Sequence, residues 1–280
     1  MSLHQATRVR SWLRHGTLTA IAIVWIAVPF WFLIVNSFKT EAEASVLSIA
    51  WPDRWNIVNN YRTVIVQGSY FRGLANSFII AVPTILAVLL LGSMAAWIYA
   101  RSHRRTVRFL YYASILSILL PPGIIPTIYL LMQLNLEGSR LGFMLALTGT
   151  RLGIVIFMVT GFVSAIPRDI EQSAFLDGAS RIRTYWHVIL PMITPVLFVG
   201  AVFLSISVWN EFFLSIYLLP DPDMATLPLT LYKFASSSQF TLKWNLVFAQ
   251  VILSNIPLLI VYVIFQKRVI GGLSEGALNG

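Results

Sequence analysis

The sequence contains no cysteine and little charge, with only 11 acidic residues among 280 positions. Without a thiol, the chain forms neither disulfides nor cysteine metal sites, so neither contributes to its fold or chemistry. Charged residues make up 11% of the chain, against roughly 25% in soluble globular domains. The polar surface that a water-soluble protein needs is therefore largely missing.

The chain instead has long apolar stretches. Hydrophobic residues make up 57% of the chain, and six apolar stretches reach the length of about 20 residues that a helix needs to cross a bilayer. These stretches are continuously apolar, which favours helices over the alternating strands of a membrane barrel. We therefore predict an all-α polytopic membrane protein, one domain over 1–280, with six spans. The predicted spans are 17–38, 74–100, 109–134, 141–166, 193–219 and 244–265.

The positions of the basic residues predict the orientation of these spans. With both termini on one side, that side carries twelve Lys and Arg residues and the opposite side seven. Basic residues concentrate on the cytoplasmic side of membrane proteins, so both termini are predicted to be cytoplasmic. The net charge of +9 follows from this topology, and we expect no nucleic-acid partner.

Motifs for catalysis and metal binding are missing. The chain has no Gly-x-x-x-x-Gly-Lys loop for nucleotide phosphates and no His-Glu-x-x-His pair for zinc. Its four histidines fall in or beside predicted cytoplasmic loops, without a second ligand at metal spacing. We therefore expect no catalytic residue, no metal site and no cofactor bound by this chain.

Polar residues inside the apolar stretches suggest a solute pathway. A carboxylate at membrane depth costs about 2–3 kcal/mol on insertion scales and needs a partner or water. Glu211 and Arg151 therefore line a pathway, pair with each other, or reach the interface, and pathway lining is the preferred interpretation. Asn210, Asn76 and Gln250 are weaker pathway candidates, because single amides often only bridge helices.

Prolines predict a break in the third stretch. Pro121, Pro122 and Pro126 each remove a backbone donor there. A broken helix at that depth indicates either a wet cavity or a packing kink.

The polar segment 167–192, between the fourth and fifth stretches, begins with a predicted short helix. Asp169 is expected to cap this helix, and Glu171 to lie exposed in its first turn, where a negative charge is favoured. Gly178 is expected to end it in the left-handed conformation.

A second short helix is predicted after Gly178. Ser180 is expected to cap its start and Pro191 to end it. Helical spacing predicts one apolar face that packs on the spans, made by Ile182, Tyr185, Trp186 and Ile189.

This segment resembles the signature of the membrane subunits of ATP-binding-cassette importers, which is an E-A-A run, a glycine seven positions after the Glu, and a final I-x-L-P. The matching residues are Glu171, Ala174, Asp177, Gly178, Ala179, Ile189, Leu190 and Pro191. Gln172 and Ser173 stand where that family has alanines. The six-span plan, the run Trp209-Asn210-Glu211-Phe212 and the last ten residues are similar to the carbohydrate-importer branch, of the maltose-permease G type.

The resemblance implies that the first loop helix is a coupling helix seated in a cleft of a separate ATPase. The implied coupling residues are Glu171, Ala174, Asp177, Gly178, Ala179 and Pro191. The cytoplasmic tail, 266–280, is implied to reach the ATPase through Gly272, Leu273 and Gly276. ATP and magnesium are expected in that ATPase.

The same resemblance implies the rest of the assembly. The expected partners are a second permease subunit, two ATP-binding subunits, an extracytoplasmic solute-binding protein and membrane lipid. The outer loop 220–243 is expected to meet the binding protein through Ser237 or Gln239. The expected location is the inner membrane of a bacterial or archaeal cell, and the expected solute is a sugar or oligosaccharide.

An ion-coupled secondary transporter or channel is the alternative. Such proteins usually place several ionisable residues or broken helices at matched positions of two halves. Here only Arg151 and Glu211 qualify, and no second half repeats the break at 121–126.

Overall fold

The computed structural model describes residues 14–236 and 242–278, with side chains as far as residue 264. Every regular element in this part of the chain is helical. The helices that are long and apolar enough to cross a membrane are Arg14–Phe38, Tyr70–Arg101, Arg140–Ala165, Arg181–Trp209 and Trp244–Ile264. The predicted all-α polytopic fold is thus confirmed.

The chain groups into two compact units, of which the first comprises Met1–Tyr70 and Leu231–Asn255. Its described elements are η1 (Ile23–Ala27), α2 (Val28–Phe38), α3 (Glu41–Ala44), α4 (Ile57–Gln67) and the beginning of α14 (Trp244–Leu278). Val64, Leu246 and Ala249 form its apolar core. Two hydrogen bonds at Asn60 hold the polar end of this unit together: its Nδ2 donates to the Lys39 carbonyl, and its Oδ1 accepts from Asn245, both at 2.8 Å.

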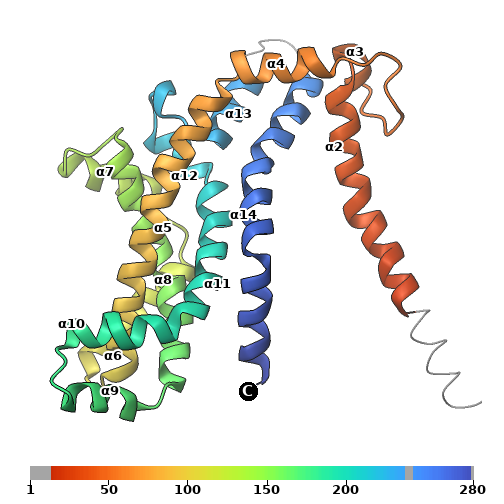
Figure 1. The fold of residues 1–280 in the computed structure, drawn as a ribbon. Coiled ribbons are helices and arrows are strands. Elements are labelled where there is room, and N and C mark those ends of the chain that lie inside the picture. Colours follow the sequence, from red (N-terminus) through yellow and green to blue (C-terminus); the bar gives the residue numbers. More distant parts are fainter. Residues whose placement is uncertain (1–13, 237–241, 279–280) are drawn as a thin grey trace, which may run out of the picture. The chain divides into compact units, whose positions relative to one another are not determined.

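The second unit comprises Phe71–Thr230 and Ile256–Gly280. Its elements in chain order are α5 (Tyr70–Arg101), α6 (Arg105–Leu119), α7 (Ile124–Gln133), α8 (Arg140–Ala165), α9 (Arg168–Leu176), α10 (Arg181–Thr184), η2 (Tyr185–Ile189), α11 (Leu190–Trp209), α12 (Phe213–Leu218), η3 (Pro222–Met224), the beginning of α13 (Leu227–Ser236) and α14 from Ile256 onward. Figure 1 shows α9 and α10 at one end of the long helices α5, α8 and α11, and α7 and α12 near the other end.

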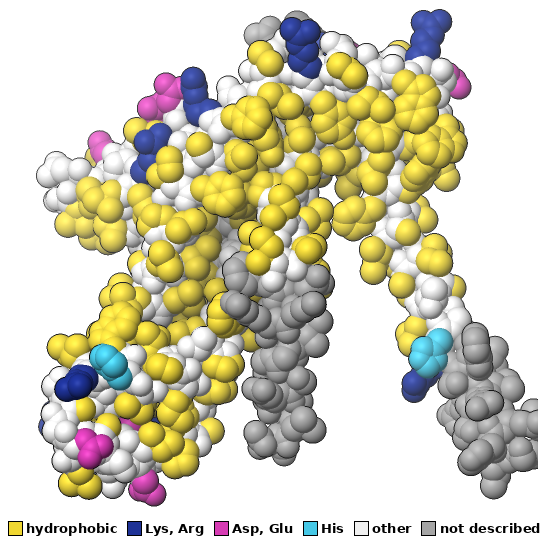
Figure 2. Space-filling view, viewed as in Figure 1, with side chains coloured by type: hydrophobic (Ala, Val, Ile, Leu, Met, Phe, Trp, Pro, Cys, Tyr) yellow, Lys and Arg dark blue, Asp and Glu magenta, His cyan; other side chains and the backbone are white. Residues whose placement is uncertain are grey.

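Two apolar clusters fill this second unit. One is built around Phe143, Leu147 and Leu214 and includes residues of α7 and α12. The other is built around Val155, Val159 and Tyr185 and lies towards α9 and α10. In Figure 2 hydrophobic side chains cover the sides of the long helices of this unit, and charged side chains lie near the helix ends, as expected for helices in a bilayer.

The third predicted span is not one helix. α6 ends at Leu119 and α7 begins at Ile124, with Pro121, Pro122 and Gly123 between them. α7 has 10 residues and is therefore about 15 Å long, half the hydrocarbon thickness. The predicted break within 109–134 is confirmed, because two adjacent prolines supply no backbone donors.

Pro191 does not end a helix. α10, η2 and α11 form one continuous helix from Arg181 to Trp209. The prediction failed because η2 is a π-helical turn, which widens the helix immediately before the proline. Pro191 follows this turn directly, as the second residue of α11, and lies inside the continuous helix.

The predicted apolar face is only partly confirmed. Tyr185 and Ile189 are buried as predicted, but Ile182 and Trp186 are exposed. The buried face of this segment is therefore narrower than the helical spacing predicts. The expected end of the fifth span at residue 219 is likewise wrong, because α11 ends at Trp209.

One close helix contact depends on a glycine. At Gly153 in α8 a β-carbon would overlap the carbonyl oxygen of Ser114 and the hydroxyl of Ser117, both in α6. Gly149, one turn earlier in the same helix, has open space at the corresponding position. Of these two glycines, only Gly153 therefore lies where the backbones of α6 and α8 approach closely.

We expect Gly153→Ala to destabilise the protein by about 1–3 kcal/mol, because a methyl group inserted against a backbone carbonyl forces the helices apart. The measurement is the midpoint of thermal unfolding in detergent. Gly149→Ala is the matched control and should keep or slightly raise the midpoint, since alanine is the better helix former. Equal midpoints for the two variants would contradict the proposed contact.

Candidate functional site

The side chain of Glu171 is buried, which corrects the expectation that it lies exposed. It lies in the first turn of α9 and is only 6% exposed. Nε of Arg101 donates to Oε1 of Glu171 at 2.7 Å, and Nε1 of Trp97 donates to Oε2 at 3.0 Å. Both carboxylate oxygens are therefore occupied by α5, and Glu171 anchors α9 to the end of that helix.

The anchor is part of a longer stripe on α5. Ser93, Trp97 and Arg101 follow one another at intervals of four residues and share one helix face. The hydroxyl groups of Ser93 and Tyr185 are 2.7 Å apart, and the rings of Trp97 and Tyr185 lie 5.9 Å apart. Arg101 also donates to the carbonyl oxygen of Ile166, at 2.9 Å. One face of α5 thus contacts the end of α8, the start of α9 and the turn η2.

Sequence reasoning missed this stripe, although a signal was present. A serine, a tryptophan and an arginine at helical spacing stand at the cytoplasmic end of an otherwise apolar span. Arg101 was counted only as a basic residue for the topology. An arginine directly before a loop is also a partner for an acid that enters the same interface.

The end of α9 is a Schellman turn centred on Gly178. Gly178 has a φ of 83°, which confirms the predicted left-handed conformation. Its N–H donates to the carbonyl of Phe175, and the N–H of Ala179 donates to the carbonyl of Ala174, both at 3.0 Å. These two bonds define the motif, so Ala174, Gly178 and Ala179 shape the turn through their backbones.

Of the two helix caps predicted in this segment, one is confirmed and the other is wrong. Ser180 accepts a hydrogen bond from the N–H of Arg183 at 3.3 Å, which confirms it as the cap of the second helix. Asp169 lies inside α9, whose N-cap is Pro167 without a side-chain hydrogen bond. The predicted cap at Asp169 is therefore wrong, and its charge acts only through the favourable field of the first turn.

The far end of α9 is exposed. Leu176 is 88% exposed, and Gln172, Ser173 and Asp177 are also exposed. The helix therefore has a fixed base at Glu171 and an open tip at Leu176 and Asp177.

A second ion pair lies within the helices of the same unit. Nη2 of Arg151 in α8 is 2.6 Å from Oε2 of Glu211, and the two side chains are 24% and 11% exposed. Oε1 of Glu211 accepts from the N–H of Leu214 at 3.0 Å. Glu211 stands in the gap between α11 and α12, so one carboxylate both neutralises Arg151 and caps the first turn of α12.

Comparison with known proteins places the chain in a family. Residues 88–273 match the family described as binding-protein-dependent transport system inner membrane component. The chain belongs to this family.

Curated relatives match the permease over almost its full length. The diacetylchitobiose uptake system permease protein NgcG of Streptomyces coelicolor is 30% identical over 93% of this chain and 87% of its own. The probable starch degradation products transport system permease protein AmyC of Thermoanaerobacterium thermosulfurigenes is 30% identical over 92% and 93%. The permease is thus a multi-pass membrane component of a transport system.

The fold also has a solved counterpart. A chain in the crystal structure of a bacterial ABC transporter involved in the import of the acidic polysaccharide alginate matches with a TM-score of 0.80. The match covers 95% of the permease and 98% of that chain, at 20% identity. At this identity the likeness concerns the fold alone.

The weaker pathway candidates of the permease have different surroundings. Nδ2 of Asn76 donates to the carbonyls of Asp223 and Ala225 at 2.8 and 3.0 Å, and its Oδ1 accepts from Arg140 at 3.0 Å. These bonds favour a structural role, tying the segment after α12 to α5. Nδ2 of Asn210 donates to the carbonyl of Ile206, within its own helix. The pathway roles of both amides stay predictions.

Gln250 differs from both of these amides. It is 0% exposed, and neither atom of its amide group has a hydrogen-bond partner among the described residues. A buried amide without partners carries a desolvation cost of about 1–3 kcal/mol. Its role in the pathway stays a prediction.

The structure describes little of two regions that are predicted to contact partner proteins. Gly272, Leu273 and Gly276 fall in the helical backbone of the last part of α14, beyond the described side chains. Ser237 and Gln239 lie outside the described residues. The contacts predicted for both regions stay predictions.

Glu171→Gln should lower the unfolding free energy of the permease by roughly 3 kcal/mol, because it leaves the partly buried Arg101 without a counter-charge. The measurement is thermal unfolding of the purified protein. Asp169→Asn removes the same charge from an exposed position in the same turn and should change the midpoint little. If both substitutions shift the midpoint equally, Glu171 is not the anchor.

Arg151 and Glu211 should show strong coupling in a double-mutant cycle. Arg151→Met or Glu211→Gln alone should cost roughly 3–5 kcal/mol, and the double variant should recover much of the loss. The matched control is the cycle for Arg72 and Asp223, an ion pair that is 60% and 71% exposed, where a coupling below about 1 kcal/mol is expected. A weak coupling between Arg151 and Glu211 would restore the pathway interpretation.

Proposed function

We propose that the permease is a membrane subunit of an ATP-driven importer for a sugar or oligosaccharide. The names of its relatives support the substrate class, since they refer to diacetylchitobiose and to starch degradation products. A third relative, the sulfoquinovosyl glycerol transport system permease protein SmoH of Agrobacterium fabrum, is 30% identical over 90% of the permease and 88% of its own length. Saccharides or saccharide conjugates recur in these names.

The proposed assembly contains four kinds of chain. Besides this permease it has a second permease, two ATP-binding subunits and an extracytoplasmic solute-binding protein. A solved relative of the same fold, at 14% identity, is described as a bacterial alginate ABC transporter in complex with an alginate-bound periplasmic protein. In this proposal both termini are cytoplasmic, and α6 and α7 together make the third of six crossings.

The observation that carries the proposal is the contrast between the two ends of α9. Its base is fixed to α5 by Glu171, Arg101 and Trp97, while Leu176 and Asp177 at its tip are open to a partner. A partner that pulls on the tip moves a helix whose base is hydrogen-bonded to a membrane span. This arrangement suits a subunit that receives motion from an ATPase and does no chemistry itself.

The turn after α9 extends the same linkage. The Schellman bonds fix the direction in which the chain leaves α9, and Ser180 then starts the helix that becomes α11. Tyr185 in that helix contacts Ser93 and Trp97. Movement of α9 is therefore proposed to reach α5 directly and α11 through the turn.

The ion pair between Arg151 and Glu211 bears on the charge of the transported solute. The Arg151–Glu211 pair has no net charge to offer an anion. We therefore favour an uncharged saccharide over an acidic one.

The test is uptake by the assembled complex. Membrane vesicles that contain the permease, the second permease, the ATPase and the binding protein should take up a labelled neutral oligosaccharide only with ATP. Uptake driven by an ion gradient without ATP would instead support the secondary transporter.

The tip of α9 should lie against the ATPase. Because the chain has no cysteine, Asp177→Cys introduces a single thiol, and a thiol-to-amine crosslinker should join it to the ATP-binding subunit. Glu137→Cys is the matched control, since Glu137 is an exposed acid at the other end of α8. Crosslinking from both positions, or from neither, would contradict the proposed contact.

A further inference from the structure

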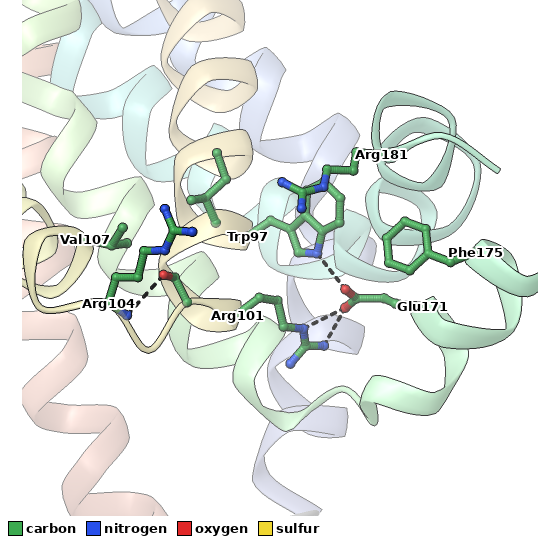
Figure 3. A pocket seen from close by; sticks show the side chains of 9 residues that line it. Trp97, Arg101, Arg104, Val107, Glu171, Phe175 and Arg181 are labelled. Carbon is green, nitrogen blue, oxygen red and sulfur yellow. Dashed lines mark hydrogen bonds and ion pairs between the residues drawn. The ribbon is translucent and has the colours of Figure 1, made fainter. Parts of the chain in front are cut away.

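A pocket of about 430 Å³ lies beside the base of α9. It is lined by the last turn of α5, the loop into α6, the buried side of α9 and the first residue of α10. Figure 3 shows Arg101 turned towards Glu171, Arg104 beside Val107, and Arg181 beside Trp97. The pocket is separate from the exposed tip of α9.

The pocket has an excess of positive charge. Three of its lining residues are arginines and one, Glu171, is an acid. Arg101 is matched by that acid, whereas Arg104 and Arg181 form no salt bridge with any residue in the described part of the chain. Two guanidinium groups on different elements therefore face one hollow without a counter-charge. Guanidinium forks suit the oxygen atoms of a phosphate.

The pocket also continues into an apolar surface. Ile98 lines the pocket, and Met94 and Leu91 precede it on α5 at spacings of four and three residues. These three side chains lie on the same side of the helix, and all of them are exposed in this unit. The stripe leads from the charged pocket along a membrane span, towards the middle of the bilayer.

From this combination we propose that the pocket binds the headgroup of an anionic phospholipid from the adjacent leaflet. The phosphate lies between Arg104 and Arg181, and one acyl chain lies along Leu91, Met94 and Ile98. Basic pockets between helices at a membrane surface are suited to such headgroups. A free phosphate ion would bind the arginines alone and make no contact with the apolar stripe. A phospholipid contacts both the arginines and the stripe.

The position of the site gives the lipid a structural consequence. Arg104 belongs to the loop between α5 and α6, and Arg181 begins the helix that follows the turn after α9. A phosphate held by both arginines connects these segments across the Glu171 anchor. The proposal rests on the membrane location of the permease, and it holds whatever the solute or the ATPase contact.

The test measures binding of spin-labelled phosphatidylglycerol to the importer complex in phosphatidylcholine vesicles. The double variant Arg104→Gln/Arg181→Gln should bind it about thirtyfold more weakly, as expected for the loss of two arginines near an anionic headgroup. Arg105→Gln/Arg108→Gln is the matched control, because it removes two exposed arginines from the nearby first turn of α6 that do not line the pocket. The control should bind as the unmodified complex does.

Three outcomes would overturn the proposal. An equal loss in the control variant would mean that only diffuse positive charge attracts the lipid. Displacement of the labelled lipid by inorganic phosphate would mean a site for free anions. Unchanged lipid binding together with loss of the ATP-binding subunit in the Arg104/Arg181 variant would mean that the pocket holds an acidic segment of that protein.

Discussion

The burial of one carboxylate organises the end of the permease that carries α9. A charge removed from water is stable only when hydrogen-bond donors surround it, and Glu171 finds them on Trp97 and Arg101. Because those donors belong to α5, the loop between two spans cannot move independently of that helix. The contacts of Arg101 with Ile166 and of Trp97 with Tyr185 then place the end of α8 and the start of α11. Without Glu171, α9 would lose both of these side-chain hydrogen bonds to α5.

The two buried ion pairs of the second unit follow the same rule at different depths. Arg101 pairs with Glu171 near the membrane surface, and Arg151 pairs with Glu211 within the helices. Each joins the first half of the unit to the second, and each acid also lies at a helix end, in the first turn of α9 or at the start of α12. The helix ends would otherwise leave backbone donors unsatisfied in a medium without water. Glu211 satisfies such a donor as well as a charge, because it also accepts from the N–H of Leu214, whereas both oxygens of Glu171 bond to side chains of α5.

Local chemistry was readable from the sequence, and distant contacts were not. Gly178 and Ser180 act as predicted, because a left-handed turn and a helix cap depend on a few adjacent residues. The break at Pro121 and Pro122 was predicted for the same reason. The exposure of Glu171 was misjudged because its partner Arg101 is 70 positions earlier, and helical periodicity says nothing about pairs at that separation. For the same reason the sequence left three roles open for Arg151 and Glu211, and only the fold shows that the two side chains pair.

The turn η2 has a consequence for the register of the helix that contains it. Its five residues, Tyr185–Ile189, contain the extra residue that distinguishes a π turn from an α turn. A turn of this kind is what a single-residue insertion leaves in a helix that continues on both sides. This turn lies between α10 and α11. It shifts the helical register between Ser180 and Pro191, so each residue can keep its own local geometry. The π turn therefore separates the helical register of the cytoplasmic turn from that of the membrane span.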